Sequence, residues 1–206
     1  MLDSLVKRSV IIGLKGGTQM KYETPILETD RLILKRGTYE DLVKVYEYDF
    51  TYLRNIDGEF KFVKFDPEKL KGWENIGDND YTLDFILYLK DTMEPIGNLV
   101  IDRYDSSNNS LEIACNLHPN YWRQGFMSEA ILKVMDYVFT NLGIDNIRYS
   151  YAEENFKSKG LSDKIGFKFL KKYEMHYKIM DKDVQEVDTI MSKDRFYELY
   201  SNLKRK

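Results

Sequence analysis

The sequence has one cysteine, two histidines and four prolines, and these low counts exclude several classes of protein. A single cysteine, Cys115, cannot form an intrachain disulfide. One thiol and two imidazoles leave few ligands for a soft-metal site, so we expect no metal. No apolar run approaches the roughly 20 residues of a membrane-spanning helix, so we expect no membrane span. The net charge of -3 gives no sign of a surface that coats nucleic acid.

What is present is typical of an ordinary globular chain. The 206 residues are 43% hydrophobic and 32% charged, enough for one domain with its own core. A basic pair and a short apolar stretch at residues 7–14 are too short for a secretion signal, so we expect a cytoplasmic protein. Met20 is a possible alternative start. We predict an N-terminal extension or leader at 1–24 and a single domain at 25–206, although residues 1–24 also fit an ordinary N-terminal arm.

Strand and helix patterns follow one another along the chain. Runs of β-forming residues predict strands at 31–36, 82–89, 96–101, 110–117, 146–151, 167–170 and 186–191. Helical spacing predicts helices after the capping residue Thr38 and at 128–141, 158–165 and 194–203. The aromatic-rich segment 50–77 is irregular, with a short helix predicted from Pro67.

The order of these elements predicts the fold class. Strands dominate the first half and strand–helix–strand the second, which favours an α+β domain. We expect a mixed, mainly antiparallel sheet of about six to seven strands with flanking helices. Because a helix connects strands 110–117 and 146–151, these two strands are predicted to be parallel.

The most informative stretch is 121–130, where a strand passes through a Gly-containing turn into a helix. Unpaired N–H groups and the helix dipole make such a helix start a place to bind phosphate. Gly125 allows the backbone to approach a ligand closely. No Gly-Lys-Ser/Thr sequence follows Gly125, which argues against a nucleotide-binding protein.

Three stretches together resemble the GNAT superfamily of acyl-CoA-dependent N-acyltransferases. They are 28–34, 118–126, and 155–158 with 164–167, and they are most similar to the branch that acetylates N-terminal amines, including those of ribosomal proteins. The resemblance implies a GNAT-like fold in which the parallel strand pair splays apart. The chain departs from the family pattern at Trp122 and Met127 in the loop, and at Ser162, where many members carry a tyrosine.

The resemblance also implies acetyl-CoA as a co-substrate and assigns residues to it. Its pyrophosphate would be bound by the turn, and its pantetheine arm would pair with strand 110–117 and contact the start of helix 158–165. The helix start also fits a simple cap and turn. The residues assigned to acetyl-CoA are Asn116, Leu117, Arg123, Gln124, Gly125, Phe126, Met127, Ser128, Asn155 and Ser158.

Two residues are assigned to catalysis. Glu112 lies mid-strand on the face away from the apolar residues, and the resemblance makes it the leading candidate for the base. A solvated surface glutamate is the alternative. Ser162 is predicted to donate a hydrogen bond to the leaving thiolate, and a helix-surface serine is the alternative. His118 and Cys115 are interpreted as structural, and Glu153-Glu154 as either an attraction for a cationic substrate or a solvated turn.

These assignments predict an enzyme that transfers an acetyl group directly from acetyl-CoA to a primary amine in a ternary complex. An α-amine, with a pKa of about 7.7–8.0, is more often neutral at pH 7 than a lysine amine, so a protein N-terminus is favoured. A small-molecule acceptor, such as an aminoglycoside, polyamine or amino acid, and a non-catalytic acyl-CoA-binding module are the alternatives. The aromatic segment 50–73 is expected to cover the acceptor side or to form a satellite core. The terminal helix is expected to pack on its own domain or on a partner, which would give a homodimer.

Overall fold

The computed structural model describes residues 10–14, 17–21, 23–47, 83–177 and 182–201. An eight-stranded sheet has the strand order β3-β4-β5-β6-β7-β8-β10-β9. Its strands are β3 (Leu27–Glu28), β4 (Leu32–Lys35), β5 (Leu83–Leu89), β6 (Pro95–Asp105), β7 (Ser110–Leu117), β8 (Asn146–Ala152), β9 (Lys168–Tyr177) and β10 (Lys182–Ser192). Every neighbouring pair is antiparallel except β7 and β8, which are parallel as the sequence predicts.

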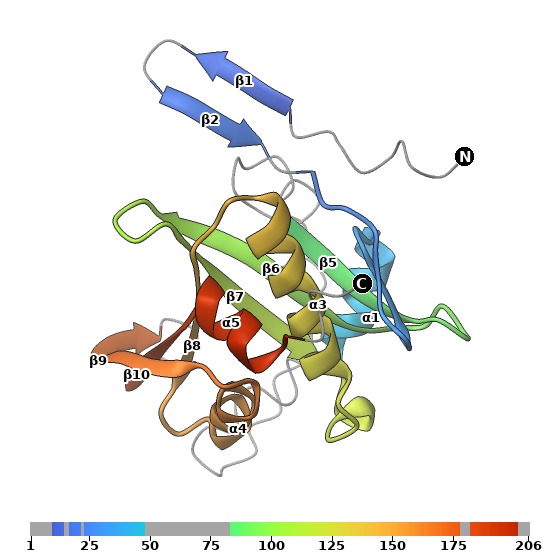
Figure 1. Cartoon of the computed structure of the whole chain (residues 1–206). Coiled ribbons are helices and arrows are strands. Elements are labelled where there is room, and N and C mark those ends of the chain that lie inside the picture. Colours follow the sequence, from blue (N-terminus) through green and yellow to red (C-terminus); the bar gives the residue numbers. More distant parts are fainter. Residues whose placement is uncertain (1–9, 15–16, 22, 48–82, 178–181, 202–206) are drawn as a thin grey trace.

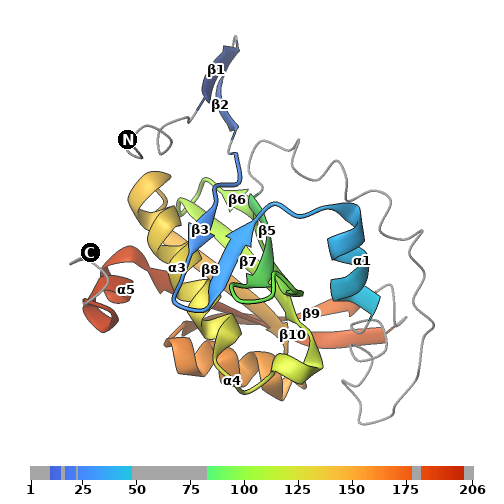
Figure 2. The same cartoon turned by 90° about the vertical axis from the view of Figure 1, so that its right-hand side faces the viewer.

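Helices cover both faces of this sheet. Helix α1 (Tyr39–Glu47) lies on one side, and α3 (Phe126–Asn141) and α5 (Lys193–Leu199) lie on the other (Figures 1 and 2). Helix α4 (Phe156–Ile165) follows β8, and a short 3-10 turn, η4 (Pro119–Tyr121), precedes α3. The mixed α+β architecture that the sequence predicts is therefore confirmed, with one or two strands more than expected.

The main hydrophobic core lies between the sheet and α3. The apolar positions predicted for α3 all belong to this core: Ala130, Ile131, Val134, Met135, Val138, Phe139 and Leu142. Phe196 of α5 is fully buried and its ring lies 5.3 Å from that of Phe139, so the terminal helix packs on its own domain. A smaller cluster on the opposite face joins α1 to Ile86 and Tyr88 of β5.

Several elements differ from the sequence prediction: β6 extends past the predicted 96–101, α5 ends before the predicted residue 203, and β3 was not predicted. Strands β9 and β10 extend beyond the predicted 167–170 and 186–191, because most of the residues that extend them are polar and give no apolar strand pattern. Strands β1 (Val10–Leu14) and β2 (Gly17–Lys21) form a separate two-stranded sheet, which projects from the main body (Figure 1). The division of the chain at residue 24 stays a prediction.

The predicted helix at Pro67 and the aromatic segment 50–73 lie outside the described residues. Within the part of the chain that the structure describes, no helix is long and apolar enough to cross a membrane. The same part holds no cluster of three or more His, Cys, Asp or Glu side chains arranged to bind a metal ion.

Candidate active site

Helix α3 begins directly after a left-handed turn at Gly125. This residue has a φ of 84° and forms the N-cap without a side-chain hydrogen bond. A left-handed residue favours glycine, and an uncapped helix start leaves N–H groups available to an anion. A Cβ at Gly125 would meet only the Nη2 atom of Arg31, at 3.5 Å, so the space beside the turn is open. The side chains of Phe126 and Met127 are buried in the core, so Met127 does not obstruct that space.

Arg31, just before β4, braces this turn from outside. Its guanidinium donates to the Gln124 carbonyl oxygen at 3.0 Å and to Glu129 Oε2 at 2.7 Å, and it lies 4.1 Å from the centre of the Phe126 ring. The Arg31 side chain thus holds the residues on both sides of Gly125 in place. No sequence pattern reveals this role, because residues so far apart in the chain share no local pattern.

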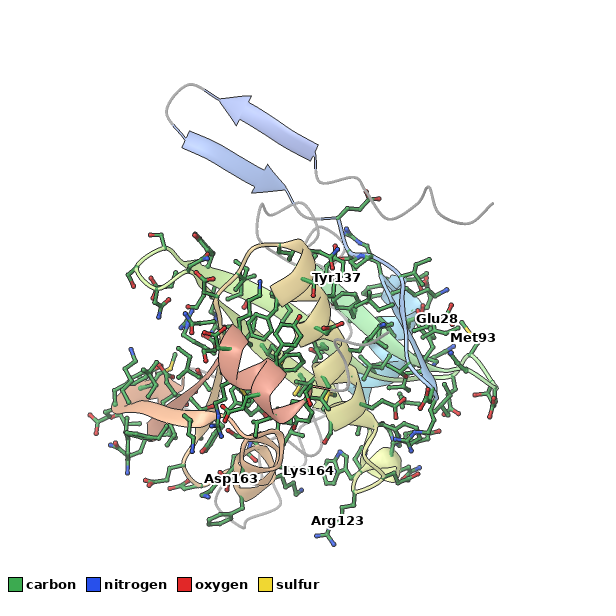
Figure 3. All side chains as sticks on the ribbon, viewed as in Figure 1. Glu28, Met93, Arg123, Tyr137, Asp163 and Lys164 are labelled. Atoms are coloured by element: carbon green, nitrogen blue, oxygen red, sulfur yellow. The ribbon has the colours of Figure 1, made fainter. Side chains whose placement is uncertain are left out.

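Two cationic side chains from different segments lie near this turn, close enough for each to affect the other electrostatically. Arg123 precedes α3 and points away from the body of the protein on the side of α4 (Figure 3). Lys157, in the first turn of α4, has its Nζ 3.9 Å from the centre of the Trp122 ring. Burial, together with repulsion from Arg123, lowers the pKa of Lys157. Like charges held together in this way favour binding of an anion between them.

The parallel pair β7 and β8 separates halfway along its length. The two strands are paired from Ser110 with Asn146 to Ile113 with Tyr149, but β7 continues to residue 117 and β8 to residue 152. Ala114, the first residue beyond the paired part, is exposed although β7 is a central strand of the sheet. The predicted splay is therefore present. We use this name for the gap between β7 and β8, which is closed at the last paired residues, Ile113 and Tyr149, and opens toward the end of β7 and the loop that leads to α3.

Asn116 and Leu117 lie on the open part of β7, next to the loop that leads to α3. The Trp122 indole donates to the Leu117 carbonyl oxygen at 2.6 Å, which ties the loop to the strand. On the other side, a Cβ at Gly97 would lie 2.4 Å from the Asn116 carbonyl oxygen, so only glycine allows β6 to approach this closely. The pairing of a pantetheine arm with this segment stays a prediction.

Asn155 and Ser158 occupy the start of α4. The Asn155 side chain accepts a hydrogen bond from the Ser158 backbone N–H at 3.1 Å, which is the capping arrangement that the sequence analysis considered as an alternative. The Ser158 side chain in turn forms a hydrogen bond with the hydroxyl of Tyr149 on β8. Burial raises the pKa of Tyr149, and this hydrogen bond partly offsets the rise. The start of α4 therefore lies beside the splayed strands, and its cap uses the Ser158 N–H rather than the Ser158 hydroxyl.

Glu112 lies at the closed end of the splay and is not a solvated surface residue. Its side chain is buried, with Oε1 2.8 Å from Arg103 Nη1 and Oε2 3.2 Å from Arg148 Nη1. Burial raises the pKa of Glu112, an effect that the two arginines oppose. A register shift in β6 and a positive φ of 51° at Arg103 accompany this contact, as expected where a β-bulge redirects a side chain.

Ser162 is buried between α4 and β10, with 1% of its surface exposed. Its hydroxyl lies 3.2 Å from the hydroxyl of Thr189, which itself donates to the Tyr149 carbonyl oxygen at 2.7 Å. Because Thr189 has a single proton, Ser162 must donate at their contact. The proton that the sequence analysis assigned to the thiolate is therefore directed to Thr189, and the catalytic role of Ser162 stays a prediction.

The substitution Ser162→Ala tests this role. We expect a loss of about 1 kcal/mol in unfolding free energy from the missing hydrogen bond, and a kcat within about threefold of the original value. Denaturant unfolding and steady-state kinetics on the same preparation would measure both. A tenfold fall in kcat with unchanged stability would instead identify Ser162 as a donor to the thiolate.

His118 and Cys115 have structural surroundings. His118 Nδ1 accepts a hydrogen bond from the Asn120 N–H at 3.1 Å and so caps the 3-10 turn before α3. Cys115 packs against the main core, with its sulfur 4.0 Å from the Tyr149 hydroxyl. Burial raises the pKa of the Cys115 thiol to about 12, so this thiol stays protonated at neutral pH.

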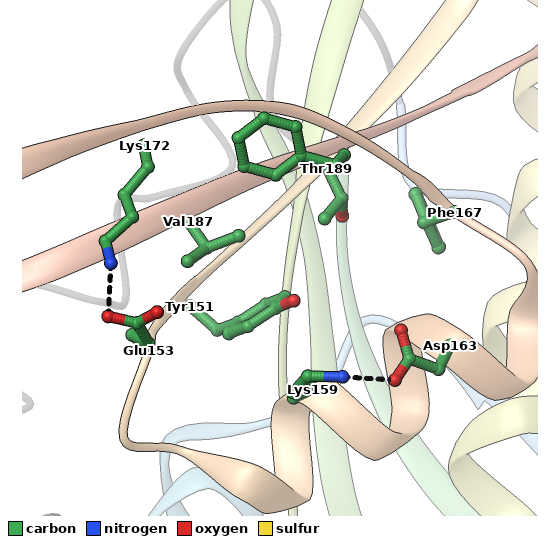
Figure 4. Close-up of a pocket in the computed structure, with 9 residues that line it drawn as sticks. Tyr151, Glu153, Lys159, Asp163, Phe167, Lys172, Val187 and Thr189 are labelled. Atoms are coloured by element: carbon green, nitrogen blue, oxygen red, sulfur yellow. Dashed lines mark hydrogen bonds and ion pairs between the residues drawn. The ribbon is translucent and has the colours of Figure 1, made fainter.

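A separate pocket of about 280 Å³ opens between β8, α4, β9 and β10. Tyr151, Val187 and Thr189 line it, with the ion pairs Glu153–Lys172 and Lys159–Asp163 near its rim (Figure 4). Glu153 thus has a lysine partner in this structure. The lining of the pocket includes neither the turn before α3 nor Glu112.

Known proteins resemble this chain over about two thirds of its length. The family model of the acetyltransferase (GNAT) domain matches residues 31–168. An uncharacterized N-acetyltransferase of Bacillus licheniformis, p20, is 30% identical over 145 residues, which cover 68% of this chain and 81% of that protein.

Two solved structures share the fold. A GNAT-family acetyltransferase from Bacillus anthracis has a TM-score of 0.69 at 19% identity, covering 82% of this chain and 99% of the other. The ribosomal-protein-S5-alanine acetyltransferase of Vibrio fischeri has a TM-score of 0.64 at 18% identity, covering 84% of this chain and 98% of the other.

Proposed function

The chain belongs to the GNAT family of N-acetyltransferases, and we propose that it transfers an acetyl group from acetyl-CoA to a primary amine, with a protein N-terminal α-amine as the favoured acceptor. One observation carries the proposal. The open turn at Gly125, with Arg123 and Lys157 beside it, lies beyond the open end of the gap between β7 and β8. An elongated ligand with a phosphate group at one end and an acyl group at the other fits that arrangement.

The turn before α3 supports binding of the acyl donor. The N–H groups of residues 124–128 and the two cations would bind its pyrophosphate, and the start of α4 would contact its pantetheine arm. This remote binding energy would position the thioester at the splay. Acetyl-CoA supplies the activated acyl group. The described residues contribute the anchoring and the orientation.

Direct transfer in a ternary complex is the mechanism that the described side chains favour. A covalent route would need a thiolate at the splay, and the raised pKa of Cys115 keeps its thiol protonated. In direct transfer, the amine attacks the carbonyl carbon and loses a proton while the C–S bond breaks, and coenzyme A leaves as a thiolate that takes up a proton from solvent. We propose that Glu112 takes this proton, directly or through water, because its carboxylate lies at the closed end of the splay.

The acceptor preference follows from the strength of this base. A carboxylate is a modest base, so a substrate that is already partly neutral suits it better. Roughly a tenth of an α-amine is neutral at pH 7, against less than roughly one lysine amine in a thousand. The fold likeness to a ribosomal-protein-S5-alanine acetyltransferase is compatible with this preference. A small-molecule amine remains the alternative acceptor, and a cytoplasmic location stays a prediction from the sequence.

Calorimetric titration with acetyl-CoA, with ATP and NAD as controls, tests the donor site first. We expect acetyl-CoA to bind selectively. A screen of peptides with free N-termini, alongside an aminoglycoside and a polyamine, would then identify the acceptor class. Binding without turnover of any amine would support a non-catalytic acyl-CoA-binding module, and the absence of binding would remove the proposal altogether.

A further inference from the structure

The face of the sheet opposite α3 carries an acidic residue level with the splay. Asp84 on β5 pairs in register with Val100 on β6, and Val100 pairs with Ala114 on β7. Ala114 is the residue at which β7 and β8 separate. Asp84 thus lies two strand spacings, roughly 10 Å, from the opening of the splay. Strand alternation places its side chain on the same face as Glu112.

Asp84 is buried without a full set of partners. Only 7% of its surface is exposed, and its Oδ1 atom has no hydrogen-bond partner. Arg36 attracts the carboxylate electrostatically, while burial raises its pKa to about 6. Most of this carboxylate is therefore charged at neutral pH. A buried charge normally has hydrogen bonds that compensate for the loss of water, and the Oδ1 atom of Asp84 has none, so it can accept a hydrogen bond from a further cationic group.

Other unpaired polar atoms lie on the same face. Four buried side-chain atoms lack a hydrogen-bond partner in the described part of the chain, and three of them belong to Asp84, Asn98 and Asn116. Asn98 and Asn116 are directly opposite each other on β6 and β7. The Asn98 amide donates to the Tyr46 hydroxyl at 3.2 Å, which leaves its oxygen as an acceptor, whereas Asn116 has an unused donor. Buried donor and acceptor atoms without partners thus lie between Asp84 and the splay.

We propose that Asp84 binds a second positive charge on the acceptor, so that the preferred substrate is a primary amine with another cationic group about two strand spacings away. The inference rests on the proposed function, because it places the reacting amine at the splay. A peptide with a lysine or arginine close to its N-terminus has this chemistry, and so does a diamine. A peptide also offers a carbonyl for Asn116 and an N–H for Asn98.

Matched acceptors test the proposal. Two short peptides that differ only in lysine or norleucine at the second position would be compared by kcat/KM. An α,ω-diaminoalkane series would be compared with monoamines of equal length. We expect the cationic member of each pair to be preferred by about tenfold or more, as for a charge-assisted hydrogen bond. A preference among peptides alone would identify a polypeptide acceptor, and a preference among diamines alone a small molecule.

The variant Asp84→Asn should remove this preference. We expect its two peptides to react at nearly equal kcat/KM, with acetyl-CoA affinity unchanged. Its Tm at pH 7 should rise, because a buried charge without a hydrogen-bond partner is lost. Asp91→Asn is the matched control, since Asp91 is exposed in the turn at the opposite end of β5.

Two outcomes would contradict different parts of the argument. If the original protein shows no preference, or Asp84→Asn keeps it, Asp84 does not bind the acceptor, while the proposed function survives. If no amine is acetylated by the original protein, the proposed function itself is wrong and the inference falls with it. The raised Tm of Asp84→Asn would show in either case that the variant is folded.

Discussion

The substitution Gly125→Glu is expected to abolish measurable binding of acetyl-CoA, with a loss of affinity of about a hundredfold or more. Two effects add. A side chain at a φ of 84° strains the left-handed backbone by about 1–2 kcal/mol. Its carboxylate would also lie where the pyrophosphate is proposed to bind, beside the first N–H groups of α3. Calorimetric titration with acetyl-CoA, supported by the Tm of the protein without ligand, would measure the loss.

The chain provides a closely matched control at the other end of the same helix. Gly143 has a φ of 68°, and a Cβ there would meet nothing within 4 Å. Gly143→Glu therefore introduces the same charge at a similarly strained residue, but away from the proposed pyrophosphate site at the turn before α3. We expect Gly143→Glu to bind acetyl-CoA with nearly the original affinity. Equal affinity of the two variants would show that the pyrophosphate does not bind at the turn before α3.

The parts of the fold that the sequence predicts well are those with a local signal. The apolar stripe of α3 repeats at helical spacing, and every residue predicted in it is buried. Strand β7 has the predicted bounds, 110–117, because apolar and polar residues alternate along it. Gly166 ends α4 in a left-handed conformation, as a glycine after a helical pattern indicates. Each of these features depends on neighbours within a few residues.

The features that the sequence does not reveal depend on contacts between distant residues. Arg31 reaches Gln124 and Glu129 across the fold, and no spacing rule connects them. The bulge in β6 that accompanies the contact of Arg103 with Glu112 has no glycine to mark it. The unpaired state of Asp84 becomes visible only once the strand register is known. Local patterns thus locate the candidate site, and the structure supplies its electrostatics.

The second large effect is expected for Glu112→Gln, which should lower kcat by about a hundredfold or more, since general bases contribute on that scale. Affinity for acetyl-CoA should change little, because Glu112 lies at the closed end of the splay and the proposed pyrophosphate site lies beyond its open end. The amide oxygen of the introduced side chain would still accept a hydrogen bond from one arginine. Because burial raises the pKa of Glu112 despite both arginines, we also expect only a small change in the free energy of unfolding.

The pH profile separates a base from a structural residue. If Glu112 is the base, kcat/KM falls as the pH drops through the raised pKa of its carboxyl, and this acidic limb disappears in Glu112→Gln. Glu28→Gln is the control, because Glu28 is an exposed acid paired with Lys90 at 3.1 Å, away from the splay (Figure 3). Glu28→Gln should keep both the original rate and the acidic limb of the pH profile.

An unchanged rate in Glu112→Gln under subsaturating conditions would remove Glu112 from the mechanism. Because this carboxylate is held by two arginines, a slower variant that kept its acidic limb would assign Glu112 to positioning Arg103 and Arg148, and the base would then be sought elsewhere on the same face.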